Sequence, residues 1–145
     1  MLFSQAKKHK VVSSTTAATV GKVAGLLVDP ATRSVVGLRL KKTEGGDLLA
    51  WSDITAFGSD AVTVTGADRI GEGDLHLKEL AHKTYKVLGK RVLSTGGDEL
   101  GKVDDVDFDL ESGTVTSLVL DGGADVTGSR LVGVGSYAVV VREDA

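Results

Sequence analysis

The sequence contains no cysteine, and aromatic residues make up only 4% of it. Without a thiol the chain cannot form a disulfide, a zinc–thiolate centre or a cysteine nucleophile. The aromatic rings are too few for a surface that stacks nucleic-acid bases. No apolar run approaches the roughly 20 residues of a membrane helix. Met1–Lys10 lacks the apolar core and cleavage site of a signal peptide. We therefore expect a soluble, cytoplasmic protein without a membrane span.

Neither positive nor negative charge predominates in the sequence. The net charge is −3 at pH 7, and no block of like charges stands out. A general nucleic-acid binder usually carries a basic domain, so the composition disfavours nucleic acid as a partner. The halves differ, because residues 1–72 carry a net charge of +2 and residues 73–145 one of −5. Opposite charges of this kind would support head-to-tail contact between copies of the chain.

One stretch occurs twice. Residues Gly21–Asp29 and Gly101–Asp109 lie 80 positions apart, begin with the same Gly-Lys-Val and end with the same Asp. At this offset Lys10–Leu40 and Lys90–Leu120 share 11 identities in 31 positions, and a further match follows at an offset of 77. A long period present twice indicates two copies of a small domain. A unit of about 65 residues is marginal alone, so we expect the copies to pack on one another.

Each copy reads as short strands separated by turns. Val20–Val28 and Ser34–Lys41 are expected to be strands, and because strand side chains alternate, Leu26 and Val28 of the first and Val36, Leu38 and Leu40 of the second should face inward. The carboxylate of Asp29 can accept backbone N–H groups in the turn between them. Gly21 and Gly25 within the first of these strands predict a bend or bulge. Such spacing is typical of a sandwich or barrel. The corresponding bend and turn residues of the second copy are Gly101 and Asp109.

A short helix is predicted between the copies. In Asp74–Thr84 the first residue can cap a helix whose apolar residues form one stripe. We therefore divide the chain into a first repeat (1–70), a connector (71–85) and a second repeat (86–145). The basic arm Met1–His9 is interpreted as a frayed or partly docked terminus; the alternative is contact with an anionic partner.

Three positions expected to face outward carry apolar side chains. A duplicated domain that covers itself would account for them, whereas single exposed apolar residues need no cause. We predict that at least two of them lie between the copies or in the interface of a homo-oligomer. They are Leu27, Val119 and Val140, which replace Asp107, Arg39 and Thr63 of the other copy.

The two copies share a longer motif. It consists of Gly-Lys-Val, an alternating strand, Asp, a turn and Val-x-x-Leu-x-Leu, followed in the first copy by Ser-Asp-Ile and Gly-Ser-Asp-Ala-Val. The second copy contains Leu88-Gly89-Lys90-Arg91-Val92 and then Gly97–Val106. This pattern resembles the PRC-barrel family, with the second copy close to the family's usual opening. The resemblance covers Lys10–Val64 and Lys86–Val141.

The resemblance implies an all-β fold of two tandem, small, strongly bent antiparallel β-barrels joined by a short helical connector. Barrels of this family occur in the H subunit of bacterial photosynthetic reaction centres, in ribosome-maturation factors of the RimM type and in small stand-alone proteins. They bind other proteins and are not enzymes. The family therefore offers neither catalytic residues nor a cofactor to transfer to this chain.

Carboxylates cluster on one strand of the second copy. Asp105, Asp107 and Asp109 would share one face at a spacing of about 7 Å. They are candidate ligands for calcium or magnesium. The spacing of an EF-hand is absent, and the first copy has Gly25 and Leu27 at the first two positions. A solvated strand face with a turn cap is therefore the favoured interpretation.

Two further sets of residues are candidates for a functional site. His76, Glu79 and His82 are spaced three apart on the expected helix, but a zinc-binding pair of histidines on a helix is usually spaced i, i+4. An exposed connector helix is favoured over a metal site. Trp51, with Phe57 nearby, is interpreted as a core or lid residue.

We expect a non-enzymatic protein-interaction or scaffold module without a cofactor, whose partner is another protein or a second copy of the chain. One alternative is a ribosome- or RNA-associated maturation factor, and another is a barrel that binds a small ligand or metal. The last needs an open interior, whereas the inward Leu, Val and Phe side chains suffice to fill so small a barrel. In the RNA alternative, phosphate would be contacted by Lys7, Lys8, Lys10, Arg39, Lys41 and Lys42.

Overall fold

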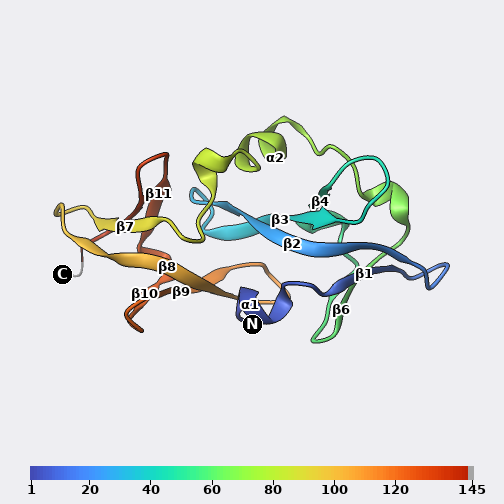
Figure 1. Ribbon diagram of the computed structural model, residues 1–145, viewed down its shortest axis with the longest axis horizontal. Coiled ribbons are helices and arrows are strands. Elements are labelled where there is room, and N and C mark those ends of the chain that lie inside the picture. The colour runs from blue at the N-terminus through green and yellow to red at the C-terminus, as the bar shows by residue number, and fades with distance from the viewer. Residues whose placement is uncertain (144–145) are drawn as a thin grey trace.

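Two six-stranded sheets form the body of the protein, one from each copy of the repeat (Figure 1). The computed structural model describes residues 1–143. The first sheet contains β1 (Lys10–Ser13), β2 (Thr19–Asp29), β3 (Ser34–Lys41), β4 (Leu48–Ala50), β5 (Ala56–Phe57) and β6 (Ala61–Val64). The second contains β7 (Arg91–Ser94), β8 (Glu99–Phe108), β9 (Val115–Leu120), β10 (Asp125–Thr127), β11 (Leu131–Val134) and β12 (Val139–Val141). The orders are β4-β3-β2-β1-β6-β5 and β10-β9-β8-β7-β12-β11. The predicted all-β fold with two barrel-like units is confirmed.

Helices are short. In the expected connector helix, the Asp74 carboxylate accepts a hydrogen bond from Leu77 N at 2.8 Å. An N-terminal helical turn was not predicted. No helix within residues 1–143 is long and apolar enough to cross a membrane. The α-helices are α1 (Phe3–Ala6) and α2 (Leu75–Leu80), and the 3₁₀ turns are η1 (Trp51–Asp53), η2 (Ala67–Arg69), η3 (Lys83–Tyr85) and η4 (Gly128–Arg130).

Each sheet contains one parallel pair of strands, which corrects the expectation of antiparallel strands throughout. β1 runs parallel to β6, with Val11 opposite Val62, and β7 runs parallel to β12, with Val92 opposite Val139. A parallel pair needs a long connection between its strands, here supplied by the strands from β2 to β5. Alternation and turn residues report pairing between neighbours along the chain, so they did not reveal this contact.

In the structure, β7 lies 81 positions after its counterpart β1, one more than the offset of 80 found by comparing the sequences of the two copies. Val11 pairs with Gly21 in the first sheet, and Val92 pairs with Gly101 in the second. The glycines are 80 residues apart and the valines 81, so Lys10 is structurally equivalent to Arg91 and not to Lys90. The extra residue lies in the β1–β2 turn, which is one residue longer than the β7–β8 turn.

The sheets share one hydrophobic core, as expected for copies that pack on one another. Where they meet, Ser34 and Thr114 form an isolated bridge. Val35 N donates to Gly113 O at 2.7 Å, and Val115 N donates to Arg33 O at 3.0 Å. Each residue of the bridge is 80 positions from its partner, so the contact joins equivalent residues. The two copies therefore meet about a local pseudo-twofold axis.

Three aromatic rings contribute to the shared core. The ring of Phe57 stacks on Trp51, with centroids 5.7 Å apart, and meets Phe108 of the second sheet edge-on at 5.5 Å. Trp51 and Phe108 are themselves 6.2 Å apart. Trp51 is partly buried against the core, which agrees with its interpretation as a core or lid residue.

Candidate functional site

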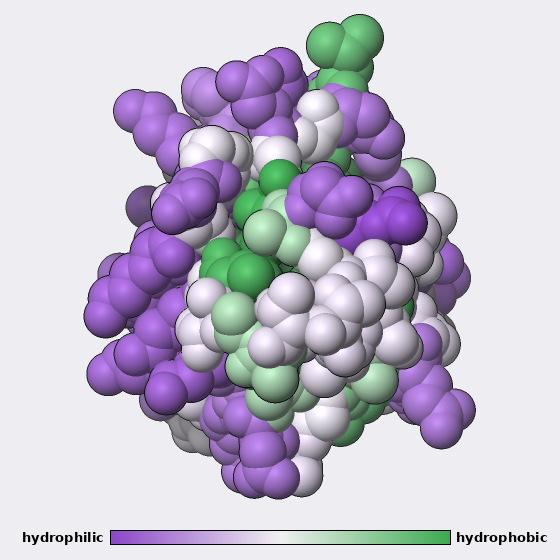
Figure 2. Space-filling model, turned by 90° about the vertical axis from the view of Figure 1, so that its right-hand side faces the viewer, coloured by the Kyte–Doolittle hydropathy of each residue, from purple (hydrophilic) through white to green (hydrophobic). Residues whose placement is uncertain are grey.

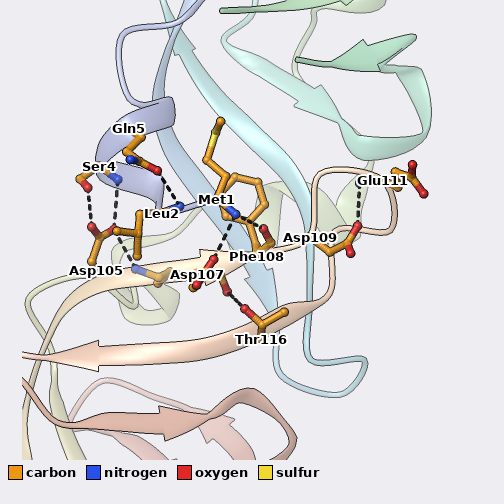
Figure 3. A network of polar contacts seen from close by, with 11 residues as sticks. Met1, Leu2, Ser4, Gln5, Asp105, Asp107, Phe108, Asp109, Glu111 and Thr116 are labelled. Atoms are coloured by element: carbon orange, nitrogen blue, oxygen red, sulfur yellow. Dashed lines mark hydrogen bonds and ion pairs between the residues drawn. The ribbon is translucent and has the colours of Figure 1, made fainter. Parts of the chain in front are cut away.

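The N-terminal arm is docked on strand β8 of the second sheet (Figure 3). The Met1 amino group contacts Asp107 Oδ1 at 3.0 Å, and Phe108 N donates to Met1 O at 2.9 Å. Ser4 N donates to Asp105 Oδ1 at 3.0 Å, and the Ser4 hydroxyl donates to the other oxygen of that carboxylate. Phe3 is only 2% exposed and belongs to the shared core. The first half of the arm is therefore held by the second copy, while Lys8 N donates to Val23 O of the first copy at 3.0 Å.

The three carboxylates proposed as cation ligands serve the chain itself. Asp105 and Asp107 hold the arm, while Asp109 Oδ1 accepts hydrogen bonds from Glu111 N and Ser112 N at 2.8 and 3.0 Å. These bonds, that of Ser112 first, lower the pKa of Asp109 below its usual range. Asp109 thus caps the turn, as its sequence position indicated. In residues 1–143 no three His, Asp or Glu side chains come together to hold a metal ion.

The spaced polar residues of the connector point to different partners. His76 Nε2 lies 2.9 Å from Asp29 Oδ2, which ties α2 to the β2–β3 turn. Glu79 accepts a hydrogen bond from the Tyr85 hydroxyl at 3.2 Å and raises the pKa of that hydroxyl. His82 bonds to Thr84 at the start of η3. His76, Glu79 and His82 therefore do not form one site.

The three apolar outward positions have different surroundings. Leu27 is 3% exposed and packs with Leu48, Leu77 and Leu80 beneath α2, so the connector covers it instead of the second sheet. Val119 and Val140 are half-buried within the second sheet. Val119 lies between β8 and β10, and Val140 lies between β7 and β11. Their role in an interface stays a prediction.

The bend residues of β2 shape its path along the sheet. The pairing of β2 with β3 shifts between Val23 and Gly25, as expected for a bulge. Gly21 and Gly101 each pair beside a register shift of the preceding strand, and Gly101 has φ +141°. Gly25 leaves open space above the strand, because a Cβ there would meet only Arg39 at 3.5 Å.

A groove of about 490 Å³ opens at the place where β2, the connector and the arm meet. Its volume lies within the range of ligand-binding clefts. Every charged or ionisable side chain that lines it is a lysine, an arginine or a histidine. Apolar lining comes from Phe3, Ala24, Leu26, Leu27, Leu80, Ala81, Val87, Leu88 and Val106, and the others are Lys7, Gly25, Arg39, His82, Lys83 and Lys86.

The basic residues of the groove differ in what holds them. Arg39 is committed, because Nη1 lies 3.3 Å from Asp47 Oδ2 and Nη2 donates to Ala81 O. Lys7, Lys83 and Lys86 form no ion pair within the described part of the chain. Their charges are therefore free to attract an anionic group. Sequence reasoning missed the groove because its walls come from five separate segments of the chain.

A second hollow is smaller and of mixed charge. Figure 2 looks at the end of the first sheet that carries the β1–β2 turn, and it shows apolar side chains gathered inside a border of hydrophilic ones. At this end, a hollow of about 210 Å³ is lined by Thr19, Val20, Lys42, Glu44, Ala67 and Ile70. Because it holds an acid and a base, it selects a ligand charge less clearly than the groove does.

Comparison with known families concerns the second half of the chain. Residues 81–145 match the family model of the PRC-barrel domain. This segment is a PRC-barrel domain. No curated protein matches the chain. The first sheet repeats the strand order and the parallel pair of the PRC-barrel domain, so Lys10–Val64 is its structural counterpart.

The groove is open because the PRC-barrel domain and its counterpart carry different residues at one position of the long strand. Gly25 occupies the position equivalent to Asp105, as their pairing with Arg39 and Val119 shows. In the PRC-barrel domain, the Asp105 carboxylate binds the arm and so covers the strand at this position. In the first copy, glycine offers no side chain to hold a covering segment. The floor of the groove therefore stays open.

Proposed function

We propose that the chain is a non-enzymatic protein-interaction module whose groove binds an acidic, apolar segment of a partner protein. The observation that carries this proposal is the composition of the groove: an apolar floor beneath a rim whose charged side chains are all basic. Apolar side chains of a partner would supply affinity by burial, and its carboxylates would meet Lys7, Lys83 and Lys86. The groove thus selects both shape and charge.

The same side chains are suited to attraction more than to proton transfer. General acid–base catalysis requires a group with a pKa near neutrality beside the reacting proton. The one imidazole of the groove, His82, bonds through Nδ1 to Thr84, and the other ionisable groups are lysines and an arginine. We therefore assign the groove a binding role and propose no reaction.

Binding is tested with two synthetic helical peptides, each with leucine on one face and either glutamate or lysine on the other. Fluorescence anisotropy at low salt should show binding of the glutamate peptide alone. Gly25→Leu fills the floor without a backbone clash and should weaken binding about tenfold or more, since one displaced anchor exceeds 1.4 kcal/mol. Gly133→Leu is the matched control, because a Cβ at Gly133 meets nothing within 4 Å.

The charge requirement is tested separately. Lys83→Gln combined with Lys86→Gln should weaken binding of the glutamate peptide and reduce its dependence on salt. Equal binding of the two peptides would contradict the proposal. So would equal effects of Gly25→Leu and Gly133→Leu.

A further inference from the structure

Three lysines stand in line across three neighbouring strands of the first sheet. Lys10 of β1 pairs directly with Lys22 of β2, and Lys22 pairs directly with Lys41 of β3. Directly paired residues place their side chains on the same face. Strands are about 4.8 Å apart, so the line spans about 10 Å. Lys8 and Lys42 flank it, and we call these five residues the lysine cluster.

The charges of the lysine cluster are uncompensated. None of the five forms an ion pair within residues 1–143. Four are exposed and Lys22 is half-buried. The pKa of Lys22 is lowered, first by Lys42, then by burial, and then by Lys41, Lys8 and Lys10. Like charges directly opposite one another destabilise a sheet. The free protein therefore carries a repulsion that a bound anion would remove.

The second sheet shows that the fold does not need these lysines. There Arg91 is equivalent to Lys10, Lys102 to Lys22, and Asp121 to Lys41. Arg91 Nη1 lies 3.4 Å from Glu99 Oε1, and its guanidinium lies 4.5 Å from the centre of the Tyr137 ring. Lys102 N donates to Asp121 Oδ1 at 3.1 Å. In the second copy, therefore, Asp121 stands in place of the third lysine, and Glu99 neutralises Arg91.

We propose that the lysine cluster binds a linear chain of phosphate groups. Successive ammonium groups in a line match an anion whose charges also follow one another closely, as in a condensed phosphate where neighbouring phosphates share an oxygen. Lysine is a common phosphate ligand that acts as a point charge. The cluster itself offers neither an aromatic ring to stack a base nor an apolar side chain to enter a bilayer, which disfavours single-stranded RNA and a membrane surface.

Calorimetric titration of the full chain at low salt tests this proposal. Inorganic tripolyphosphate should bind, and orthophosphate should bind at least tenfold more weakly because it reaches fewer lysines. ATP and a longer inorganic polyphosphate distinguish the sources of the phosphate chain. Binding of ATP as tight as that of tripolyphosphate would indicate a nucleotide, and tighter binding of the longer chain would indicate the polymer.

Variants locate the site. Lys22→Gln should weaken tripolyphosphate about tenfold, the effect of losing one charge-assisted contact, and should lower the salt slope by about one. Lys102→Gln, at the equivalent position of the second sheet, should change neither quantity. Gly25→Leu should also leave phosphate binding unchanged, so failure of the groove proposal and failure of this one are distinguishable. Without ligand, Lys22→Gln should raise the Tm, because it removes repulsion.

Three results would overturn the proposal. One is the absence of heat with tripolyphosphate at low salt. Another is an equal loss of binding in Lys22→Gln and Lys102→Gln. The third is tighter binding of an RNA oligonucleotide, or of vesicles containing phosphatidylserine, than of the condensed phosphates.

Discussion

The long strands β2 and β8 have equivalent places in their sheets, yet each is covered by a different segment. Leu27 of β2 lies beneath the apolar side of α2, while Asp107, its equivalent on β8, contacts the amino group of the N-terminal arm. Two residues earlier, Gly25 leaves a groove open and Asp105 binds Ser4. The inward positions keep the same apolar pattern in both copies. The copies therefore diverged on their outer faces, and the residues there determine which segment covers each strand and which surface stays free.

The copies also differ in how they make tight turns. Lys8, Ala17 and Arg33 have positive φ values of 78°, 60° and 54°. The structurally equivalent residues of the second copy are glycines, which adopt this region without steric cost. Arg33 gains a compensating contact, since its Nε donates to Leu131 O at 2.7 Å. The second copy thus has relaxed turns where the first copy holds strained ones. The second copy's three residues are Gly89, Gly97 and Gly113.

The largest effect should come from removing the anchor of the arm. Phe3→Ala deletes a ring that is 2% exposed within the shared core, so it should lower the free energy of unfolding by about 3–5 kcal/mol. Urea denaturation measures the change. Leu75→Ala on α2 is the control, because Leu75 is 86% exposed and its loss should be nearly neutral. Equal stability of the two variants would mean that α1 is not part of the core in solution.

Gly113→Ala tests the junction of the copies. A Cβ at Gly113 would stand 2.8 Å from Val35 O and 3.1 Å from the Trp51 ring, at φ +79°. Strain and overpacking together should cost about 3 kcal/mol. Gly89→Ala has the same φ but open space, so it should cost only the strain, about 1–2 kcal/mol. Thermal denaturation distinguishes them, and a Gly113→Ala variant no less stable than Gly89→Ala would show that the junction yields easily.

The contact between the arm and β8 should show coupling of intermediate size. Ser4→Ala, Asp105→Ala and the double variant form a thermodynamic cycle for a charge-assisted hydrogen bond to a carboxylate that is 9% exposed. The expected coupling is about 1–2 kcal/mol, because the Ser4 backbone N–H remains in every variant. Additivity within about 0.3 kcal/mol would show that the hydroxyl contributes no stability there.

Sequence patterns revealed what repeats locally and missed what depends on distant segments. The recurring Gly-Lys-Val and the turn at Asp29 predicted two copies and the hairpin between β2 and β3, since both features report on neighbours along the chain. The parallel pair of β1 and β6 was missed for the same reason. The arm looked like a basic tail because the residue that binds Ser4 lies on β8, the strand that α1 contacts, about a hundred residues away.

The site was less predictable than the fold. Leu27 was identified from the sequence as an apolar residue on an outer face. The six-residue helix α2 covers it, and no local sequence pattern shows where that helix packs. The row formed by Lys10, Lys22 and Lys41 needs the register of three strands, because in the sequence these lysines are more than ten residues apart. The RNA alternative grouped Lys8, Lys10, Lys41 and Lys42 by composition and did not include Lys22.

The smallest effect concerns the strained turn between β1 and β2. Ala17 has φ +60° on an exposed turn where the second copy has Gly97, so Ala17→Gly should relieve strain of about 1–2 kcal/mol. Glycine also gives the unfolded chain more freedom, which costs about 0.5–1 kcal/mol. The net gain should be about 0.5 kcal/mol, or a rise in Tm of roughly 2 °C. Ala18→Gly is the control, because Ala18 has no positive φ and its substitution should lower the free energy of unfolding by about 0.5–1 kcal/mol. A stabilising Ala17→Gly beside a destabilising Ala18→Gly would establish that the first copy carries turn strain that glycine removes in the second.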